Sequence, residues 1–304
     1  MKHYYSLNEY YKNRFNKKVY KISINGGMTC PNRDGTLGTK GCIFCSEGGS
    51  GEFSASAELR ISEQLKSAIE RVKTKTKDNL FIAYFQPFTN TYASTDYLRR
   101  IFYEAIEPDC IVGLSIATRP DCLDDEKLEL LKELNQIKPV SVELGLQTIH
   151  EKTAEYIRRG YKLEVYDEAV RKLRNAGIDI VTHVIIGLPY ETEEMMLETV
   201  EYVGKRTDGI KLQLLHVLKN TDLAKEYQSG KFEVLSLENY TDIIIKAIER
   251  LPERVVIHRI TGDGDKKSLI APMWSADKKR VLNYINREME RRDVKQGKFL
   301  LQKA

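Results

Sequence analysis

Three cysteines in one loop are the residues of this sequence best arranged for chemistry. Cys30, Cys42 and Cys45 lie in the segment 29–49, "TCPNRDGTLGTKGCIFCSEGG", with the spacing C-x11-C-x2-C. Gly, Asn, Asp and Thr fill the gaps, which is typical of a loop. A structural zinc site needs four protein ligands, and no His lies in this segment to supply the fourth. Iron–sulfur clusters are also held by thiolates, and together with the barrel that the rest of the sequence predicts this favours a four-iron cluster with one open iron over zinc or three unrelated core cysteines.

The rest of the chain alternates short apolar runs with longer amphipathic segments, which predicts strands and helices in turn. Strands that are connected by helices pair in parallel through right-handed crossovers. The pattern therefore predicts an α/β fold, a partial (β/α)6 TIM-like barrel, with a doubly wound open sheet as the topological alternative. Asp124 and Thr192 are expected to cap helices and Gly177 to end one. The expected strands are 19–24, 80–85, 111–116, 140–144, 180–186 and 209–215, and the expected helices are 58–77, 95–107, 124–135, 163–175 and 193–205.

In a parallel barrel, functional side chains gather at the carboxyl ends of the strands. The cysteine loop follows the first predicted strand. The other five are followed by segments rich in amides, hydroxyls, imidazoles, Gly or Pro: "FQPFTNTY", "SIATRPDC", "ELGLQT", "THVIIGLP" and "QLLHVLKNT". A purely structural barrel would not need such groups at every strand end, so we expect the active site there.

The region after the sixth strand is expected to form a C-terminal extension. The sequence predicts a helix at 237–251, a strand at 255–260 and a basic helix at 275–292. We expect residues 1–220 to form the catalytic core, and residues 221–304 to pack on the barrel and to include the basic terminal helix.

Composition limits where the protein works and with what. The chain has 304 residues, 41% of them hydrophobic, and a formal net charge of +4, which permits an anionic partner without requiring one. Its five cysteines are few and odd in number, which disfavours a disulfide framework and favours a reducing cytoplasm. No apolar run is long enough to span a membrane, and the polar N-terminus is unlike a secretory signal. We therefore expect a cytoplasmic protein with no membrane partner.

Six motifs of the chain together carry a resemblance to one enzyme family. The motifs are "GGMTCPNRDGTLGTKGCIFCSEGGSGEF", "YFQPFTNTYA", "ATRPDCL", "VELGLQTIHEKTAEYIRRGY", "HVIIGLPYET" and "HRITGDG". With Phe44 before the last cysteine and the βα order, they resemble the radical S-adenosylmethionine (radical SAM) superfamily. Most of that superfamily spaces its cysteines C-x3-C-x2-C, and the wider gap here resembles the Elp3-like branch and, within it, the YtqA/YhcC-like bacterial proteins.

The resemblance implies two cofactors and a mechanism. Cys30, Cys42 and Cys45 would bind three irons of a [4Fe-4S] cluster, and S-adenosylmethionine (SAM) would bind the fourth. One electron from the reduced cluster cleaves SAM to methionine and a 5′-deoxyadenosyl radical, which takes a hydrogen atom from the substrate. An external one-electron donor such as flavodoxin or ferredoxin would reduce the cluster.

The resemblance also implies cofactor contacts for individual residues. Gln147 in "GLQT" matches a glutamine that faces the ribose, and a buried amide bonded to backbone is the alternative. Arg159 in "IRRGY" matches an arginine that pairs with the methionyl carboxylate, with the adjacent Arg158 as the other candidate. His183 stands where relatives often place Asp, and is expected to bond ribose or substrate or to be a core residue.

Two departures from the family pattern affect the methionyl ammonium. "QPFTN" replaces the Gly-Gly-Glu loop after the second strand, so Gln86, Thr89 or Asn90 would have to bind this group. Ala117 and Thr118 replace the usual acidic residue at the third strand, and Thr118 is included among the expected cofactor contacts.

Three further residues near the third strand are expected to be structural. Arg119 and Asp121 are expected to pair with each other rather than contact the cofactor. Cys122 is expected to be a small buried thiol, with a radical relay as the alternative, and Cys110 to be structural.

Charge and the resemblance together suggest the substrate. Basic and aromatic residues interleave in "YYKNRFNKKVYK" and in "KKRVLNYINREMERRDVKQGK", which suits phosphate contacts and base stacking as well as ordinary solvated faces. The resemblance implies tRNA, with conversion of 5-carboxymethylaminomethyluridine to 5-aminomethyluridine at the wobble position. The alternatives are radical oxidation or rearrangement of a small metabolite such as a tetrapyrrole, and a non-catalytic tRNA- or metal-binding protein.

Overall fold

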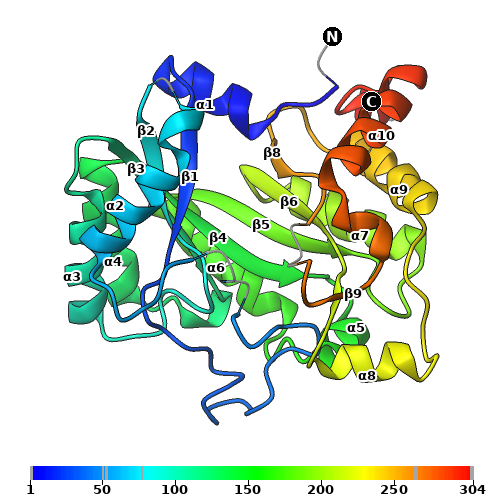
Figure 1. Cartoon of the computed structure of the whole chain (residues 1–304), viewed down its shortest axis with the longest axis horizontal. Coiled ribbons are helices and arrows are strands. Elements are labelled where there is room, and N and C mark those ends of the chain that lie inside the picture. Colours follow the sequence, from blue (N-terminus) through cyan, green and yellow to red (C-terminus); the bar gives the residue numbers. More distant parts are fainter. Residues whose placement is uncertain (1–2, 50, 52–53, 77, 263–265, 302–304) are drawn as a thin grey trace.

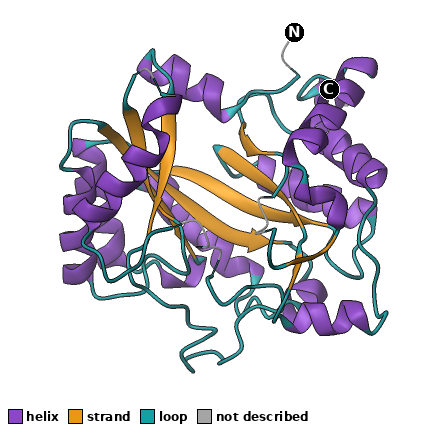
Figure 2. Cartoon of the chain, in the orientation of Figure 1, coloured by secondary structure: helices purple, strands orange, loops and turns teal. Residues whose placement is uncertain are grey.

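The structure, a computed structural model, describes residues 3–49, 51, 54–76, 78–262 and 266–301. Seven parallel strands form one curled sheet, with helices packed around it (Figures 1 and 2). In sheet order the strands are β1 (Val19–Ile24), β2 (Leu80–Phe85), β3 (Ile111–Thr118), β4 (Val140–Gln147), β5 (Asp179–Ile186), β6 (Gly209–Leu214) and β8 (Val256–Arg259).

The predicted partial barrel is confirmed, and its sheet gains one strand from the C-terminal region. The strand order follows the chain, so each crossover moves one position in the same direction and the sheet can curl towards a barrel. A doubly wound sheet would reverse direction at a switch point, and no such reversal occurs among the described strands. The strand expected at 255–260 is β8, which pairs with β6.

Helices connect successive strands, and their predicted ends are largely confirmed. The side chains of Asp124 and Thr192 cap α4 (Asp125–Ile137) and α7 (Glu193–Gly204) by accepting hydrogen bonds from backbone N–H groups. Gly177 follows α6 with a φ of 69°, a left-handed conformation that glycine adopts without strain. The connecting helices are α2 (Ile61–Val72), α3 (Thr95–Ile106), α4 (Asp125–Ile137), α5 (Glu151–Tyr156), α6 (Leu163–Asn175) and α7 (Glu193–Gly204).

The helix expected at 58–77 is shorter in the structure. It begins at Ile61, because the Glu63 side chain accepts a hydrogen bond from the backbone N–H of Arg60, and it passes into a single 3-10 turn after Val72. Several residues named above lie outside the described part: Lys77 at the end of this predicted helix, Ser50, Glu52 and Phe53 of the cysteine-loop motif, and Asp263 and Gly264 of the last motif.

A short N-terminal helix, α1 (Leu7–Phe15), is absent from the sequence-based prediction. It packs against both edge strands, β1 and β8, and lies on the opposite side of the molecule from the cysteine loop in Figure 1. The backbone N–H of Ile257 in β8 donates to the carbonyl of Tyr5, just before this helix. Because an open sheet edge exposes unpaired backbone groups, these contacts protect the edges of the incomplete barrel.

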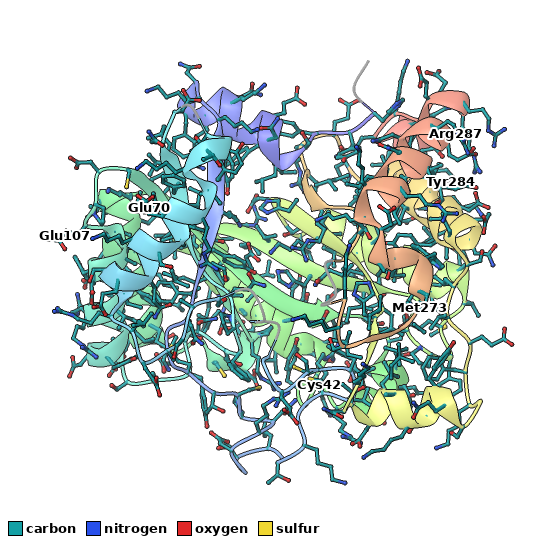
Figure 3. The ribbon with its side chains drawn as sticks, viewed as in Figure 1. Cys42, Glu70, Glu107, Met273, Tyr284 and Arg287 are labelled. Carbon is teal, nitrogen blue, oxygen red and sulfur yellow. The ribbon has the colours of Figure 1, made fainter. Side chains whose placement is uncertain are left out.

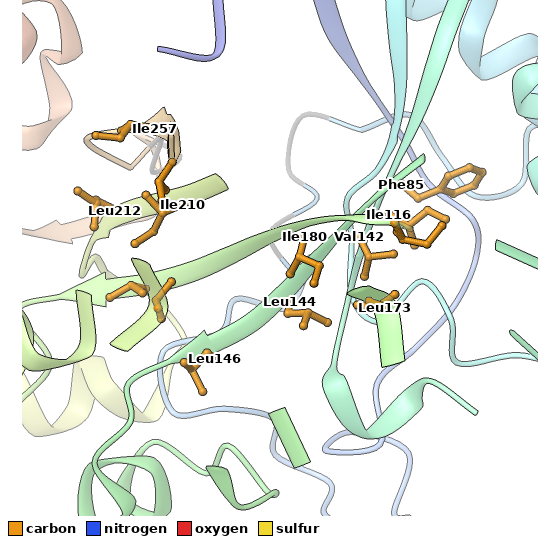
Figure 4. Packing of buried hydrophobic residues seen from close by; sticks show 14 of the residues in the cluster. Phe85, Ile116, Val142, Leu144, Leu146, Leu173, Ile180, Ile210, Leu212 and Ile257 are labelled. Carbon is orange, nitrogen blue, oxygen red and sulfur yellow. The ribbon is translucent and has the colours of Figure 1, made fainter. Parts of the chain in front are cut away.

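The main hydrophobic core lies between the sheet and its surrounding helices. Figure 4 shows side chains of neighbouring strands packed together, including Phe85, Ile116, Val142 and Ile180, with Leu173 from α6. All five are fully buried. Each such side chain stabilises the fold by roughly 1.5–3 kcal/mol relative to exposure, so this packing fixes the strands that carry the site.

After β6 the chain adds a small antiparallel sheet and further helices. The helices expected at 237–251 and 275–292 correspond to α9 and α10. The division of the chain at residue 220 stays a prediction, and β8 from the later part belongs to the main sheet. No helix in the described part of the chain is long and apolar enough to cross a membrane. The added elements are β7 (Val217–Leu218), β9 (Leu269–Ala271), α8 (Asp222–Gln228), α9 (Leu237–Arg250), α10 (Lys278–Arg291) and α11 (Lys298–Leu301).

Candidate active site

The carboxyl ends of the strands and the cysteine loop enclose a cavity of about 390 Å³. This volume lies in the range of small-molecule sites, roughly 300–1,000 Å³. Cys30, Cys42 and Cys45 all line the cavity, and Figure 3 shows Cys42 among the loops at that end of the barrel. Five of the expected cofactor contacts line it as well: Gln86, Thr118, Gln147, Arg159 and His183.

The cysteine loop is held in place by hydrogen bonds within the loop and to the barrel. The N–H of Cys45 donates to the carbonyl of Cys42 at 3.0 Å, which forms a tight turn between these two thiols. Arg33 donates to the carbonyl of Cys45 at 3.2 Å. The amide of Asn32 donates to the carbonyl of Arg158 at 2.7 Å and lies 3.5 Å from Cys42 Sγ. Sequence reasoning missed both supporting side chains, because their acceptors are backbone atoms or lie far along the chain.

The arrangement of the three thiols fits a cluster. No three Cys, His, Asp or Glu side chains in the described part of the chain converge where one metal ion could sit. In a four-iron cluster each cysteine binds a different iron, so three thiols distributed around one cavity are the expected arrangement. Burial raises the pKa of the Cys42 thiol to about 12, and the neighbouring Cys45 adds to this shift. Coordination to iron would supply the positive charge that stabilises the thiolate.

Gln147 presents a buried polar atom that fits a ligand hydroxyl. Its Oε1 is buried and has no hydrogen-bond partner among the described residues. Its φ of 72° lies in the left-handed region, which is strained for a residue other than glycine. A Cβ at Gly145 would come within 3.1 Å of the Gln147 amide nitrogen, so this glycine leaves room for the amide. An unpaired buried amide oxygen is costly, and a ribose hydroxyl would relieve that cost.

Arg159 lines the cavity, whereas Arg158 points elsewhere. The buried Arg159 guanidinium donates to two backbone carbonyls, at 2.6 and 2.9 Å, and pairs with Glu151 at 2.9 Å. Among the described residues these contacts use three of its five N–H groups, so two could serve a ligand. Arg158 pairs with Asp222 of α8 at 2.8 Å. Of the two candidates, the structure therefore brings Arg159 to the cavity.

The expected clamp between Arg119 and Asp121 is present. Two guanidinium N–H groups of Arg119 donate to the Asp121 carboxylate at 2.9 and 2.7 Å, and a third donates to the carbonyl of Arg159 at 2.8 Å. Thr118, the preceding residue, shares a 2.6 Å hydrogen bond with the Thr91 hydroxyl. The clamp thus connects the carboxyl end of β3 to the loop that carries Arg159.

The residues considered for the methionyl ammonium are divided by the structure. Gln86 and Thr89 line the cavity, whereas Asn90 is not among the lining residues. The Asn90 amide donates to three backbone carbonyls at 2.9–3.1 Å, including that of Ala117 in β3, and so ties two strand ends together. Its Oδ1 is buried and lacks a hydrogen-bond partner in the described part of the chain. The ammonium contacts of Gln86 and Asn90 stay predictions.

The two cysteines outside the loop have structural surroundings. Cys122 is buried, and burial raises the pKa of its thiol to about 12, as expected for an unreactive buried thiol. Cys110 is partly buried and packs against the main core at the start of β3. Neither is among the residues that line the cavity.

A buried polar cluster lies where the strands line the cavity, and sequence reasoning missed it. Its centre is Glu143 of β4, a fully buried carboxylate. The signal that could have revealed it is a charged residue in the middle of an apolar run, as in "VSVELG" and "GIKLQL". The Glu143 carboxylate accepts hydrogen bonds from side chains on five other strands: Lys21 Nζ (2.5 Å), Tyr84 OH (2.8 Å), Ser115 Oγ (3.0 Å), His183 Nε2 (2.7 Å) and Lys211 Nζ (2.5 Å).

The pairing of charges sets the protonation of this cluster. Burial alone would raise the pKa of Glu143, but Lys21 and Lys211 hold that pKa well below its usual range. Burial, together with the Lys211 charge, lowers the pKa of His183 to about 4. Burial also lowers the pKa of Lys211 to about 7. At neutral pH the cluster therefore holds an ionised Glu143 and a neutral His183, with Lys211 as a hydrogen-bond donor to the Glu143 carboxylate.

The depressed pKa of His183 should make the protein less stable in mild acid. In the unfolded chain His183 binds a proton near pH 6.5, but in the folded protein only near pH 4, so the unfolded state binds more protons between these values. Stability should fall as pH falls through this window. From pH 7 to pH 5 the loss attributable to His183 is at most about 2 kcal/mol. His183→Gln, which keeps an N–H donor for Glu143, should lose correspondingly less stability than the wild type in urea unfolding at the two pH values. Equal losses in both proteins would contradict the assignment.

The sequence matches a known enzyme family over most of its length. Residues 30–203 match the radical SAM superfamily, and residues 207–291 match its C-terminal domain. The chain is 46% identical to the uncharacterized protein YtqA of Bacillus subtilis, covering 98% of this chain and 93% of that protein. It is 38% identical to protein YhcC of Escherichia coli, covering 86% and 84%.

More distant similarities lie in the Elp3-like branch. The chain is 29% identical to the tRNA uridine(34) acetyltransferase of Methanocaldococcus jannaschii over 53% of this chain and 30% of that protein. The archaeal Elp3 of Methanocaldococcus infernus, lacking its N-terminal residues 1–46, has a similar fold, with a TM-score of 0.70 at 18% identity over 91% of this chain and 64% of that one. The predicted family and its YtqA/YhcC-like relatives are thus confirmed, and the chain belongs to the radical SAM superfamily, whose cofactors are a [4Fe-4S] cluster and SAM.

Proposed function

We propose that this radical SAM enzyme acts in the cytoplasm on the wobble uridine of tRNA and converts its 5-carboxymethylaminomethyl side chain to aminomethyl. The observation that carries the proposal is the strand-end cavity, where three thiols lie with Gln147 and Arg159. The similarity to a tRNA uridine(34) acetyltransferase supports tRNA as the substrate. The methylene between nitrogen and carboxylate has an activated C–H bond, which suits hydrogen-atom abstraction.

Residues of the cavity wall would hold the two cofactors. Cys30, Cys42 and Cys45 would bind the cluster, Gln147 Oε1 would accept a ribose hydroxyl, and Arg159 would use its remaining N–H groups on the methionyl carboxylate. When bound, the cofactors supply a 5′-deoxyadenosyl radical that takes one hydrogen atom from the carboxymethyl carbon of the substrate. Loss of one more electron, to a one-electron acceptor such as flavodoxin or ferredoxin, and of a proton would leave an imine, and water would cleave its C=N bond to give the aminomethyl group and glyoxylate. The protein positions the groups and restricts water, which is the main contribution of a protein in cofactor chemistry.

Further contacts complete the proposed arrangement. Gln86, Thr89 and Asn90 remain the candidates for the methionyl ammonium, whose N–H groups need acceptor oxygens, and Thr118 is a further candidate cofactor contact. A flavodoxin or ferredoxin would supply the electron from outside, because the cluster must be reduced before each cleavage of SAM.

The two basic, aromatic segments differ in how well they support RNA binding. In α1, Tyr11 is buried and Tyr10 donates to Asp179 at 3.1 Å, so these rings are packed and do not present faces for base stacking. In α10, the exposed Arg287 lies over the ring of Tyr284, 5.3 Å from its centroid (Figure 3). Cations beside aromatic rings are used to bind single-stranded RNA, so α10 supports the proposal and α1 does not.

The proposal predicts a defined change in tRNA. In a strain that lacks the gene, 5-carboxymethylaminomethyluridine should accumulate at the expense of aminomethyl products, as measured by mass spectrometry of tRNA nucleosides. Wild-type protein should restore the pattern, and a Cys45→Ala variant should not, because it would lack a cluster ligand. In vitro, deuterium on the carboxymethyl carbon should appear in 5′-deoxyadenosine.

Two controls decide between this substrate and the alternatives. Unmodified tRNA transcript should not stimulate formation of 5′-deoxyadenosine, since it lacks the target C–H bond. Unchanged tRNA nucleosides together with no deuterium transfer would exclude the proposed substrate and favour a small metabolite.

A further inference from the structure

Three residues on neighbouring strands, His183, Lys211 and Arg259, lie side by side in the cavity lining, and we call this row the cavity floor. His183 of β5, Lys211 of β6 and Arg259 of β8 line the cavity, and the strand register pairs His183 with Lys211 and Lys211 with Arg259. Side chains at paired positions of neighbouring parallel strands share one face of a sheet. A ligand that reaches the cavity floor can therefore contact all three.

Lys211 has a hydrogen-bond donor to spare. An ammonium group has three N–H donors. Among the described residues two acceptors are used, the hydroxyl of Tyr84 at 3.0 Å and the carboxylate of Glu143 at 2.5 Å. The side chain is only 7% exposed, so water has little access to it. A buried ammonium with an unused donor is a suitable partner for an anionic acceptor in the cavity.

His183 offers an acceptor next to that donor. Ionised Glu143 can only accept hydrogen bonds, so the 2.7 Å contact requires the proton of His183 on Nε2. With its pKa lowered to about 4, the ring is neutral at physiological pH, and Nδ1 then carries a lone pair. The cavity floor therefore places an acceptor for an N–H group beside a donor for an anion.

The charges around the cavity favour an anion. Glu143 is the single carboxylate among the described residues that line it, whereas Lys211 and Arg259 are two cations in the same lining. A third cation, Lys21, pairs with the Glu143 carboxylate together with Lys211. The proximity of Lys21 and Arg259 contributes to the lowered pKa of Lys211, after burial. A bound anion would offset this repulsion and stabilise the charged form of Lys211.

We infer that the cavity floor binds an N-substituted glycine unit of the substrate, with Lys211 and Arg259 on its carboxylate and His183 Nδ1 accepting its amine N–H. This inference rests on the proposed function, since the carboxymethylaminomethyl group is such a unit. It assigns substrate contacts to Lys211 and His183, whose hydrogen bonds in the described chain leave donor or acceptor capacity unused, and to Arg259, which lies beside Lys211 in the strand register. A neutral side chain, or the aminomethyl product, would lack the carboxylate and bind less tightly.

The test measures binding without turnover. Cluster-containing protein, without SAM or reductant, is titrated with fluorescent anticodon stem–loops that carry the carboxymethylaminomethyl group, its methyl ester, or the aminomethyl group. The wild type should bind the carboxylate form about ten- to a hundredfold more tightly than the ester, the effect of one charge-assisted contact. Lys211→Met and Arg259→Gln should abolish most of this preference while retaining binding of the aminomethyl form. Lys132→Met, a partly exposed lysine of α4 that pairs with Glu129, is the matched control and should keep it.

A second arm is independent of tRNA. Isothermal titration compares N-benzylglycine with N-benzylglycinamide, which lacks the negative charge, and the same variants should lose the preference for the glycine. Lys211→Met leaves the buried Glu143 carboxylate with one fewer counter-charge and could therefore prevent folding. In that case the double variant Glu143→Gln/Lys211→Met replaces it in both binding experiments, because the double variant removes the carboxylate as well. Arg259→Gln leaves the hydrogen bonds to Glu143 intact.

The outcomes separate this inference from the proposed function. Stem–loops that bind without a carboxylate preference, or variants that retain the preference, would overturn the assignment of the cavity floor. Stem–loops that fail to bind, with N-benzylglycine still preferred and the preference lost in the variants, would support the cavity floor and exclude tRNA. Displacement of N-benzylglycine by equimolar inorganic phosphate would assign the floor to a phosphate group and overturn the inference.

Discussion

Replacing Cys30, Cys42 or Cys45 by Ala should remove almost all of the iron–sulfur chromophore from protein reconstituted without oxygen. Three cysteines already leave one iron of a [4Fe-4S] cluster for SAM, so a further loss opens a second iron to solvent and external thiols. Iron and sulfide analysis with visible absorption measures the cluster directly. Formation of 5′-deoxyadenosine should fall with it, because no other thiol lines the cavity among the described residues.

Cys110→Ala is the matched control for this loss. Cys110 packs against the core at the start of β3, away from the cavity, so its replacement should leave the iron content unchanged. Stoichiometric zinc with no iron in the anaerobically prepared wild type would refute cluster binding by these three residues.

Most of the barrel could be predicted because its strands are buried. Parallel strands covered on both faces appear as short apolar runs, and these runs located all seven strands of the main sheet. Their carboxyl ends were harder to locate. The runs expected to end at 116 and 144 continue in the structure to Thr118 and Gln147, because backbone pairing extends beyond the apolar core into the cavity wall.

Helix α1 was missed for a related reason. It is mostly polar, and its tyrosines pack in a small cluster with residues of β1, β2 and β3, most of which lie far along the chain. The same tyrosines, read locally, suggested an exposed RNA-binding segment. Nothing within a short window distinguishes a ring that stacks on a base from one that covers the end of a barrel.

In the site, too, features formed within one segment could be predicted, whereas features formed by residues from several strands could not. The cysteine loop is a local pattern, and all three thiols line one cavity as expected. The cluster around Glu143 is assembled from single residues on six strands, and a charged residue within an apolar run marks Glu143 and Lys211 without showing their partners. Only the parallel register brings these residues into contact, so knowledge of the pairing is needed before the cluster can be seen.

Glu143→Gln should be among the most destabilising single changes on the cavity side of the sheet, at about 3–5 kcal/mol, because it leaves buried cations without their counter-charge. Lys21 and Lys211 both contact the Glu143 carboxylate at 2.5 Å, and their side chains are only 14% and 7% exposed. An amide cannot neutralise either ammonium. Typical domains are stable by only about 5–15 kcal/mol, so this loss should be plain in urea unfolding at pH 7.

Two further variants isolate the cause of that loss. Glu133→Gln removes an exposed ion pair with Arg99 and should cost no more than about 1 kcal/mol.

Adding Lys211→Met to Glu143→Gln removes one of the stranded charges, so the double variant should be more stable than the sum of the two single losses predicts, by about 0.5–3 kcal/mol. If Glu143→Gln proved no more harmful than Glu133→Gln, the carboxylate would not be the counter-charge on which the interior of this barrel depends.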